Sequence, residues 1–316
     1  MTATGAVPSP RLHVVTGKGG TGKTTVATAL ALGLAGPGRR VLLCEVEGRQ
    51  GVARLLGTEE LPYAETEVAE GAGGGQVVAL AVEPRAALLE YLDTFYRLGR
   101  AGRALERVGA VDFIATVAPG LRDVLLIGKV YEAVRRTTGA GAPTYDAVVL
   151  DAPPTGRITR FLGIGEELAT LAGGGPVAGQ SASVAALLRS PATAVHVATL
   201  LEELPVAETV EAVAELRAAG LPVGAVVADR VLAPAPPLPD PAAMAEALAV
   251  AGLDAALAGG LLAEAGAHRA RVAAQDAHLA ALAALGVPVR QLPSLGGGVD
   301  LEGLYSLADL LAGGLP

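Results

Sequence analysis

Two lysines stand close together in the glycine-rich segment TGKGGTGKTT, which runs from Thr16 to Thr25. They are Lys18 and Lys23, and the chain has only one other lysine, Lys129. The stretch GKGGTGKT within this segment fits the phosphate-binding pattern G-x-x-x-x-G-K-[ST], the P-loop. Its glycines let backbone N–H groups converge on phosphate oxygens, and the start of the following helix adds partial positive charge. The motif therefore predicts a site for ATP.

The pattern gives each polar side chain of this loop a task. Lys23 should reach the β- and γ-phosphates and act in catalysis, and the Thr24 hydroxyl should ligate Mg²⁺. Asp151, which ends the apolar run YDAVVLD, is the second expected Mg²⁺ ligand, either directly or through water. Two plainer readings stay open: an incidental glycine-rich turn, and an aspartate that only caps a turn or helix. The candidate nucleotide contacts in the loop are Gly17, Gly19, Gly20, Thr21, Gly22, Lys23, Thr24 and Thr25.

The tripeptide KGG that begins at Lys18 makes the loop more specific than the general motif. With the following TGKT it resembles the deviant P-loop of MinD, ParA, the nitrogenase iron protein and the arsenite-pump ATPases. In that class the early lysine reaches the nucleotide of the other subunit, so the resemblance implies that Lys18 is catalytic in trans. A cation there would offset charge that develops on the γ-phosphate. The alternative is a solvated loop lysine.

A second motif narrows the resemblance. The segment APPTGRITRFL at 152–162 is similar to the TAPTGHTLRFL signature of the arsenite-pump ATPase and tail-anchored-protein targeting ATPase family. Further similarity falls on VLLCEVEGRQGVARLLG at 41–57 (switch I), APGLRDVLL at 118–126, VVADR at 226–230, and the C-terminal stretch from Gln291. The resemblance implies an ATPase that uses ATP and Mg²⁺ and couples its nucleotide state to a protein or membrane-associated partner.

Several positions depart from that family. Glu47 stands where the family has the switch I aspartate that positions the attacking water, and Arg157 replaces the switch II histidine. Asp229 replaces the asparagine that reads adenine, and the resemblance adds Arg230 and Pro293 as nucleotide contacts. A glutamate can still orient water, but catalysis is sensitive to displacements of ~1 Å. We therefore expect Glu47 to be catalytic and hydrolysis to be slow without a partner, with an ordinary charged loop residue as the alternative.

The elements around these residues alternate between β-rich runs and helical stretches, which predicts an α/β fold. The runs are apolar throughout, as in strands covered on both faces. The expected fold is a mostly parallel P-loop NTPase sheet flanked by helices, with a helical lobe inserted. Strands are predicted at 11–17, 39–48, 76–84, 145–154, 193–202, 223–231 and 287–293.

The expected domain organisation is a flexible tail at 1–10 and a single ATPase domain at 11–316. The helical region at about 84–140 is too long for a simple crossover, so it should form the lobe together with 163–190. A proline-rich connector at 232–243 leads into alanine-rich helices that end near Leu285. No segment reads as a signal peptide or a membrane span.

Composition limits the partners. The formal net charge is −8 and no long basic run occurs, which argues against nucleic acid as a partner. The single cysteine, Cys44, lies in an apolar run that reads as a buried strand, and one cysteine cannot build a Cys-x-x-Cys zinc site or a Cys-ligated iron–sulfur cluster. The four histidines show no ligand spacing and are expected in the core or on the surface. A reducing, cytoplasmic location fits, with any membrane association supplied by a partner.

The leading hypothesis is a dimeric ATPase switch, either a homodimer or a heterodimer with a related ATPase subunit. The apolar stretch at 168–190 is a candidate groove for a hydrophobic protein client, and an ordinary buried helix explains it equally well. One alternative is a MinD- or ParA-like positioning ATPase, although the chain end VDLEGLYSLADLLAGGLP lacks the basic residues of a MinD membrane helix. Another is a nucleotide-binding structural subunit with little turnover.

Overall fold

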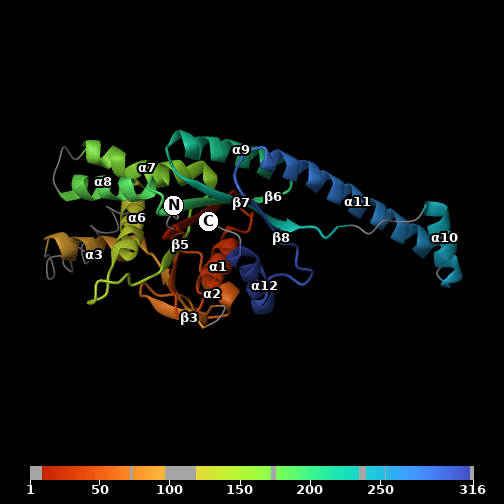
Figure 1. The fold of residues 1–316 in the computed structure, drawn as a ribbon, viewed down its shortest axis with the longest axis horizontal. Helices are drawn as coiled ribbons and strands as arrows, with labels where there is room; N and C mark the ends of the chain where they lie inside the picture. Colours follow the sequence, from red (N-terminus) through yellow and green to blue (C-terminus); the bar gives the residue numbers. More distant parts are fainter. Residues whose placement is uncertain are drawn as a thin grey trace, which may run out of the picture.

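An eight-stranded sheet forms the centre of the computed structural model (Figure 1). Its strand order is β3-β4-β2-β5-β1-β6-β7-β8, and every neighbouring pair is parallel except β3 and β4. The strands are β1 Leu12–Gly17, β2 Arg40–Glu45, β3 Thr66–Glu70, β4 Gln76–Ala81, β5 Ala147–Asp151, β6 Thr193–Leu200, β7 Val223–Val231 and β8 Val289–Pro293. The residues that the structure describes are 9–71, 74–96, 119–171, 176–234, 240–252 and 254–313.

The predicted fold class is confirmed, and all seven predicted strands are present at the expected places. The residue pattern did not predict β3, the antiparallel strand at one edge of the sheet. Its sequence, TEVAE, carries two glutamates, both of which are exposed, while the other three residues are half-buried. An edge strand with an exposed face lacks the continuous apolar run by which the other strands were found.

Helices cover both faces of the sheet. Three helices cover one face: α1 (Lys23–Leu34), α2 (Gly51–Leu56) and α12 (Leu301–Ala312). They enclose one apolar core with the strand side chains that point to this face. On the other face lie α3 (Pro84–Tyr96), α6 (Pro119–Arg135), α7 (Thr155–Leu171), α8 (Pro176–Leu188) and α9 (Glu203–Ala218), which enclose a second core. Cys44 is fully buried in this second core, as predicted.

Part of the second face corresponds to the predicted helical lobe. Helices α3, α6, α7 and α8 contact one another and gather at one end of the molecule (Figure 1). Residues 97–118 and 172–175 of the predicted lobe lie outside the described residues, as do residues 1–8 of the predicted tail. The lobe therefore remains a prediction as a unit, and so does the client groove at 168–190.

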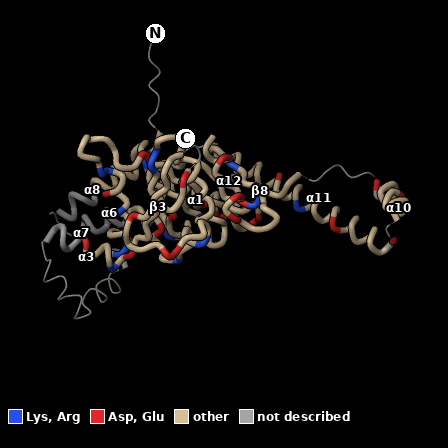
Figure 2. The backbone as a smooth tube through the Cα atoms, turned by 90° about the horizontal axis from the view of Figure 1, so that it is seen from below, with Lys and Arg blue, Asp and Glu red and all other residues tan. Residues whose placement is uncertain are grey.

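At the opposite end, α11 (Ala255–Ala283) projects beyond the sheet and carries α10 (Pro241–Val250) near its tip (Figure 1). With 29 residues, α11 is about 43 Å long. Asp240 and Asp254 cap the starts of α10 and α11 by accepting backbone N–H groups. Acidic and basic residues are interspersed over the body and along α11 (Figure 2). Within the described ranges, no helix is both long and apolar enough to cross a membrane.

Candidate functional site

The loop between β1 and α1 holds the glycine-rich motif. Gly17, Gly20 and Gly22 all have positive φ angles, 154°, 86° and 81°, which favour glycine. At Gly22 a Cβ would also collide with the carboxylate of Asp229, so the loop cannot accept a side chain there. Within the loop, the Thr21 hydroxyl donates to the Lys18 carbonyl over 2.8 Å. The chain thus forms a tight turn whose backbone leads into the N-terminus of α1.

Lys23 begins α1 and folds back over this turn. Its Nζ donates to the Lys18 carbonyl at 3.2 Å, and the residue is only 8% exposed. Burial lowers the pKa of Lys23, while the negative charges of Asp151 and Glu47 oppose that shift. A nearly buried lysine at the start of a helix, beside a glycine-rich loop, is an arrangement that can receive phosphate oxygens.

Thr24 and Asp151 meet across the pocket. The Thr24 hydroxyl donates to Asp151 Oδ2 at 2.7 Å. Asp151 ends β5, which lies between β1 and β2, so the sheet itself brings this carboxylate beside the loop. Burial raises the pKa of Asp151 to about 7, although the hydrogen bond from Thr24 opposes the shift. A hydroxyl and a carboxylate are hard oxygen donors, so the pair fits Mg²⁺, which takes one or two protein ligands and fills its shell with water and phosphate.

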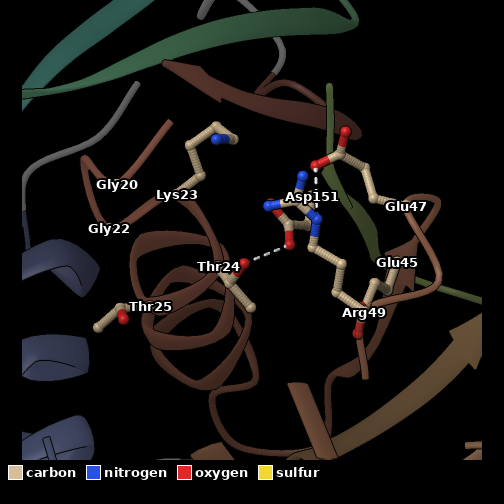
Figure 3. A pocket seen from close by; sticks show the side chains of 9 residues that line it. All are labelled: Gly20, Gly22, Lys23, Thr24, Thr25, Glu45, Glu47, Arg49 and Asp151. Atoms are coloured by element: carbon tan, nitrogen blue, oxygen red, sulfur yellow. Dashed lines mark hydrogen bonds and ion pairs between the residues drawn. The ribbon is translucent and has the colours of Figure 1, made fainter. Parts of the chain in front are cut away.

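These side chains line one pocket of about 150 Å³ (Figure 3). That volume is below the usual range for complete ligand pockets, so it suits phosphate groups and a metal ion. In Figure 3 the loop glycines form one wall, Lys23 crosses the top, and acidic side chains with Arg49 form the opposite wall. The lining residues are Gly20, Gly22, Lys23, Thr24, Thr25, Glu45, Glu47, Arg49 and Asp151.

Glu47 lies in the loop after β2 and reaches the pocket wall, as its predicted role requires. Its Oε2 lies 3.8 Å from Nε of Arg49. Glu45 was not predicted, yet it is 3% exposed and accepts the backbone N–H groups of Gly51 and Val52 at 3.1 and 3.2 Å. Glu45 therefore caps α2, and an acidic residue inside an apolar strand was the sequence signal for it.

Lys18 points away from Lys23. Its Nζ donates to Oε1 of Glu208, which belongs to α9 of the same chain. The Lys18 side chain is 54% exposed, and the second oxygen of Glu208 is buried without a hydrogen-bond partner among the described residues. The isolated chain thus provides an internal partner for the lysine that the resemblance assigns to the neighbouring subunit.

The three predicted base contacts lie together at the ends of β7 and β8, beside the loop but outside the pocket lining. Arg230 donates to the Gly20 carbonyl and lies 3.4 Å from the Asp229 carboxylate, and its φ angle is 55°. Asp229 is 6% exposed, and burial raises its pKa. Pro293 pairs in register with Val231. Asp229 and Arg230 thus support the loop directly, whatever they contribute to base recognition.

Arg157 lies in the first turn of α7, where the family motif has histidine. Its Nη2 lies 3.7 Å from Asp123 Oδ1 on α6, so the two segments picked out by the resemblance are neighbours in space. Burial raises the pKa of Asp123, and Arg157 opposes that shift. This contact joins the helix that follows Asp151 to the helices at the end of the molecule.

Two of the four histidines lie in the core. His13 on β1 and His196 on β6 stack with ring centroids 5.4 Å apart, and His13 Nδ1 lies 3.1 Å from His196 Nε2. Burial lowers the pKa of His13 to about 4 and that of His196 to about 3, so both rings are neutral near pH 7. Their pairing was not predicted. Among the described residues, no group of three or more His, Cys, Asp and Glu side chains could hold a metal ion.

Comparisons with known proteins agree with this geometry. Residues 11–173 match the family model described as "Anion-transporting ATPase". The chain is 52% identical over 318 residues to ATPase BagA of Mycobacterium tuberculosis, covering 96% of this chain and 92% of that protein. It is 26% identical over 164 residues to ATPase GET3 of Candida glabrata, covering 50% of this chain and 46% of that protein.

Proposed function

Because this chain belongs to the anion-transporting ATPase family, as the sequence motifs indicated, we propose that it binds and hydrolyses ATP at the P-loop pocket and acts as a nucleotide-dependent switch. One observation carries the proposal: Lys23, Thr24 and Asp151 line a single pocket, and the Thr24 hydroxyl lies 2.7 Å from the Asp151 carboxylate. Related chains are named ATPases, which supports the activity at the level of the family.

Each side chain then has a defined task. The loop amides and Lys23 bind the phosphates, while Thr24 and Asp151 hold Mg²⁺, which neutralises phosphate charge. Glu47 lies on the opposite wall of the pocket from the glycine loop, where it can orient the water that attacks the γ-phosphate (Figure 3). The products are ADP and inorganic phosphate.

The switch acts through a second subunit, as the resemblance implies. Lys18 of one chain would enter the nucleotide site of its partner, and it must first leave Glu208 of its own chain. The pair is half-exposed, with side chains 54% and 22% accessible, and exposed ion pairs are worth about 0–1 kcal/mol, so a new contact to a phosphate can replace it. The partner is a second copy or a related ATPase subunit, and the change of association couples the nucleotide to a client protein or membrane-associated partner.

A binding subunit with little turnover is the second candidate. It is favoured by the Lys18–Glu208 pair, because this contact within one chain holds Lys18 away from the nucleotide site of a partner. The two candidates share ATP binding and differ in turnover.

Calorimetric titration with ATP and Mg²⁺ tests the shared step. We expect the unaltered chain to bind ATP and Lys23→Ala to lose binding, since this variant removes the buried cation of the pocket. Lys129→Ala is the matched control, because Lys129 pairs with Glu90 and Glu132 away from the pocket. Normal ATP affinity in a folded Lys23→Ala protein would refute the assignment. Phosphate release by the unaltered chain, measured in parallel, separates the two candidates.

A further inference from the structure

Arg49 is the second cation of the pocket, and the family motifs assign it no task. We propose that Arg49 is a catalytic residue that acts within its own chain, with its guanidinium bound to the γ-phosphate of ATP. This inference rests on the proposed function and extends it, because it gives the isolated chain its own means of sensing the terminal phosphate.

The position of Arg49 supports this role. The residue lines the same pocket as Lys23, Thr24 and Asp151, and Figure 3 shows its side chain extending from the pocket wall to its ion pair with Glu47. Its side chain is 70% exposed, so a ligand can reach it. Its only ion pair among the described residues is the 3.8 Å contact with Glu47, which is long enough to be exchanged for a phosphate.

The backbone that carries Arg49 is anchored on both sides. Arg54 Nη2 donates to the Arg49 carbonyl at 2.6 Å. The next residue, Gln50, has a φ of 53°. Its side-chain amide donates to the Leu61 carbonyl at 3.0 Å and accepts the Leu61 N–H at 2.8 Å. Before the loop, Glu45 binds the first turn of α2. Because these contacts fix the main chain, only the Arg49 side chain must adjust when phosphate enters, and such preorganisation lowers the cost of binding.

The arrangement of charges indicates which phosphate Arg49 meets. The loop glycines form the wall that receives the inner phosphates and Lys23 extends from it toward the γ-phosphate, while Asp151, Glu47 and Arg49 form the opposite wall (Figure 3). The terminal phosphate must therefore lie on the side that has two carboxylates and one arginine. Lys23 and a Mg²⁺ ion at Thr24 and Asp151 would offset part of the phosphate charge, and Arg49 is the cation that lies next to the carboxylate of Glu47. A planar guanidinium can bind two phosphate oxygens at once.

The test compares ATP with ADP, because only ATP has the γ-phosphate. Calorimetry in the presence of Mg²⁺ should show that Arg49→Ala weakens a non-hydrolysable ATP analogue by roughly tenfold to a hundredfold. ADP affinity should stay unchanged. Arg49→Lys should keep part of the preference, since it retains the charge and loses the planar fork. Arg39→Ala, which removes an exposed arginine at the other end of β2, is the matched control and should behave as the unaltered chain.

The outcomes separate this inference from the proposed function. An equal loss of affinity for ADP and the ATP analogue, or no loss for either, would overturn the role of Arg49. The proposed function would still stand if Lys23→Ala abolished ATP binding. If the unaltered chain bound neither nucleotide, both would fail. Thermal melting checks that the variants fold. If Arg49→Ala does not fold, the comparison of ATP-analogue and ADP affinities is made with Arg49→Lys.

Discussion

Lys18 and Lys23 share one short loop, yet their side chains make opposite contacts. Lys23 folds back onto the loop and is nearly buried, whereas the Lys18 side chain forms an ion pair with Glu208 on α9. The loop therefore holds one lysine against its own backbone and leaves the other free of the loop, paired with α9. The ion pair to Glu208 becomes a competitor of any contact that Lys18 makes in a second subunit.

Glu208→Gln should weaken the contact between Lys18 and α9 that competes with any contact of Lys18 to a second subunit. Removing one charge of a half-exposed ion pair is worth up to about 1 kcal/mol, or up to about fivefold in an equilibrium. We therefore expect ATP-dependent association of subunits to occur at a lower protein concentration, as measured by analytical ultracentrifugation. Glu211→Gln, on the exposed part of the same helix, should leave association unchanged. A Glu208→Gln protein that associates less readily would mean that Glu208 positions Lys18 instead of competing for it.

Part of the site could be predicted from residue patterns alone. Residues of the P-loop are contiguous, and the strand that ends in Asp151 is strongly apolar, so the meeting of Thr24 with Asp151 follows from a parallel sheet. Arg49 and Glu208 could not be found in this way. Arg49 depends on the conformation of a loop held by Arg54 and Gln50, and Glu208 lies 190 residues from Lys18 along the chain.

At the scale of elements, the central strands carry an unusual pair. β1 and β6 bury His13 against His196, and Gly224 on β7 leaves room for the second ring, because a Cβ there would collide with it. The seven strands with continuous apolar runs were predictable, and β3 was not, because three of the five residues of this edge strand are polar. The histidine pair depends on strand order, which periodicity does not provide.

The histidine pair should make the fold sensitive to acid. Burial lowers both pKa values, to about 4 and about 3. Below pH 6.5 the two histidines therefore bind protons in the unfolded chain and stay neutral in the folded chain. The contribution to stability is complete above pH 6.5 and is lost as pH falls toward 4. At pH 5 the loss is about 2 kcal/mol for each ring.

Urea denaturation at pH 7 and pH 5 measures this effect. The unaltered chain should lose several kcal/mol between the two, and His13→Gln should lose less, because one titrating ring is gone. His268→Gln, outside the core, should match the unaltered chain. The account of the pair would be wrong if His13→Gln kept the full pH dependence.

At the scale of the whole molecule, the pocket lies between two helical extensions. Arg157 connects the helix after Asp151 to α6 at one end, and α9, which binds Lys18 through Glu208, contacts both α7 and α11. These contacts connect the surroundings of the pocket to both helical ends of the molecule. The proposed switch thus depends on a complete site made by two chains.

Mixing two inactive variants tests this claim most directly. Lys23→Ala should lose ATP binding, and Lys18→Ala should bind ATP and fail to hydrolyse it, with a loss of about 10³ or more in turnover. A mixed dimer contains one complete site, with the P-loop of Lys18→Ala and the Lys18 of Lys23→Ala. Phosphate release by the mixture, with mixed dimers verified by native mass spectrometry, is predicted to recover to at most about a quarter of the unaltered rate. Unaltered turnover by Lys18→Ala, or verified mixed dimers that stay inactive, would contradict the account.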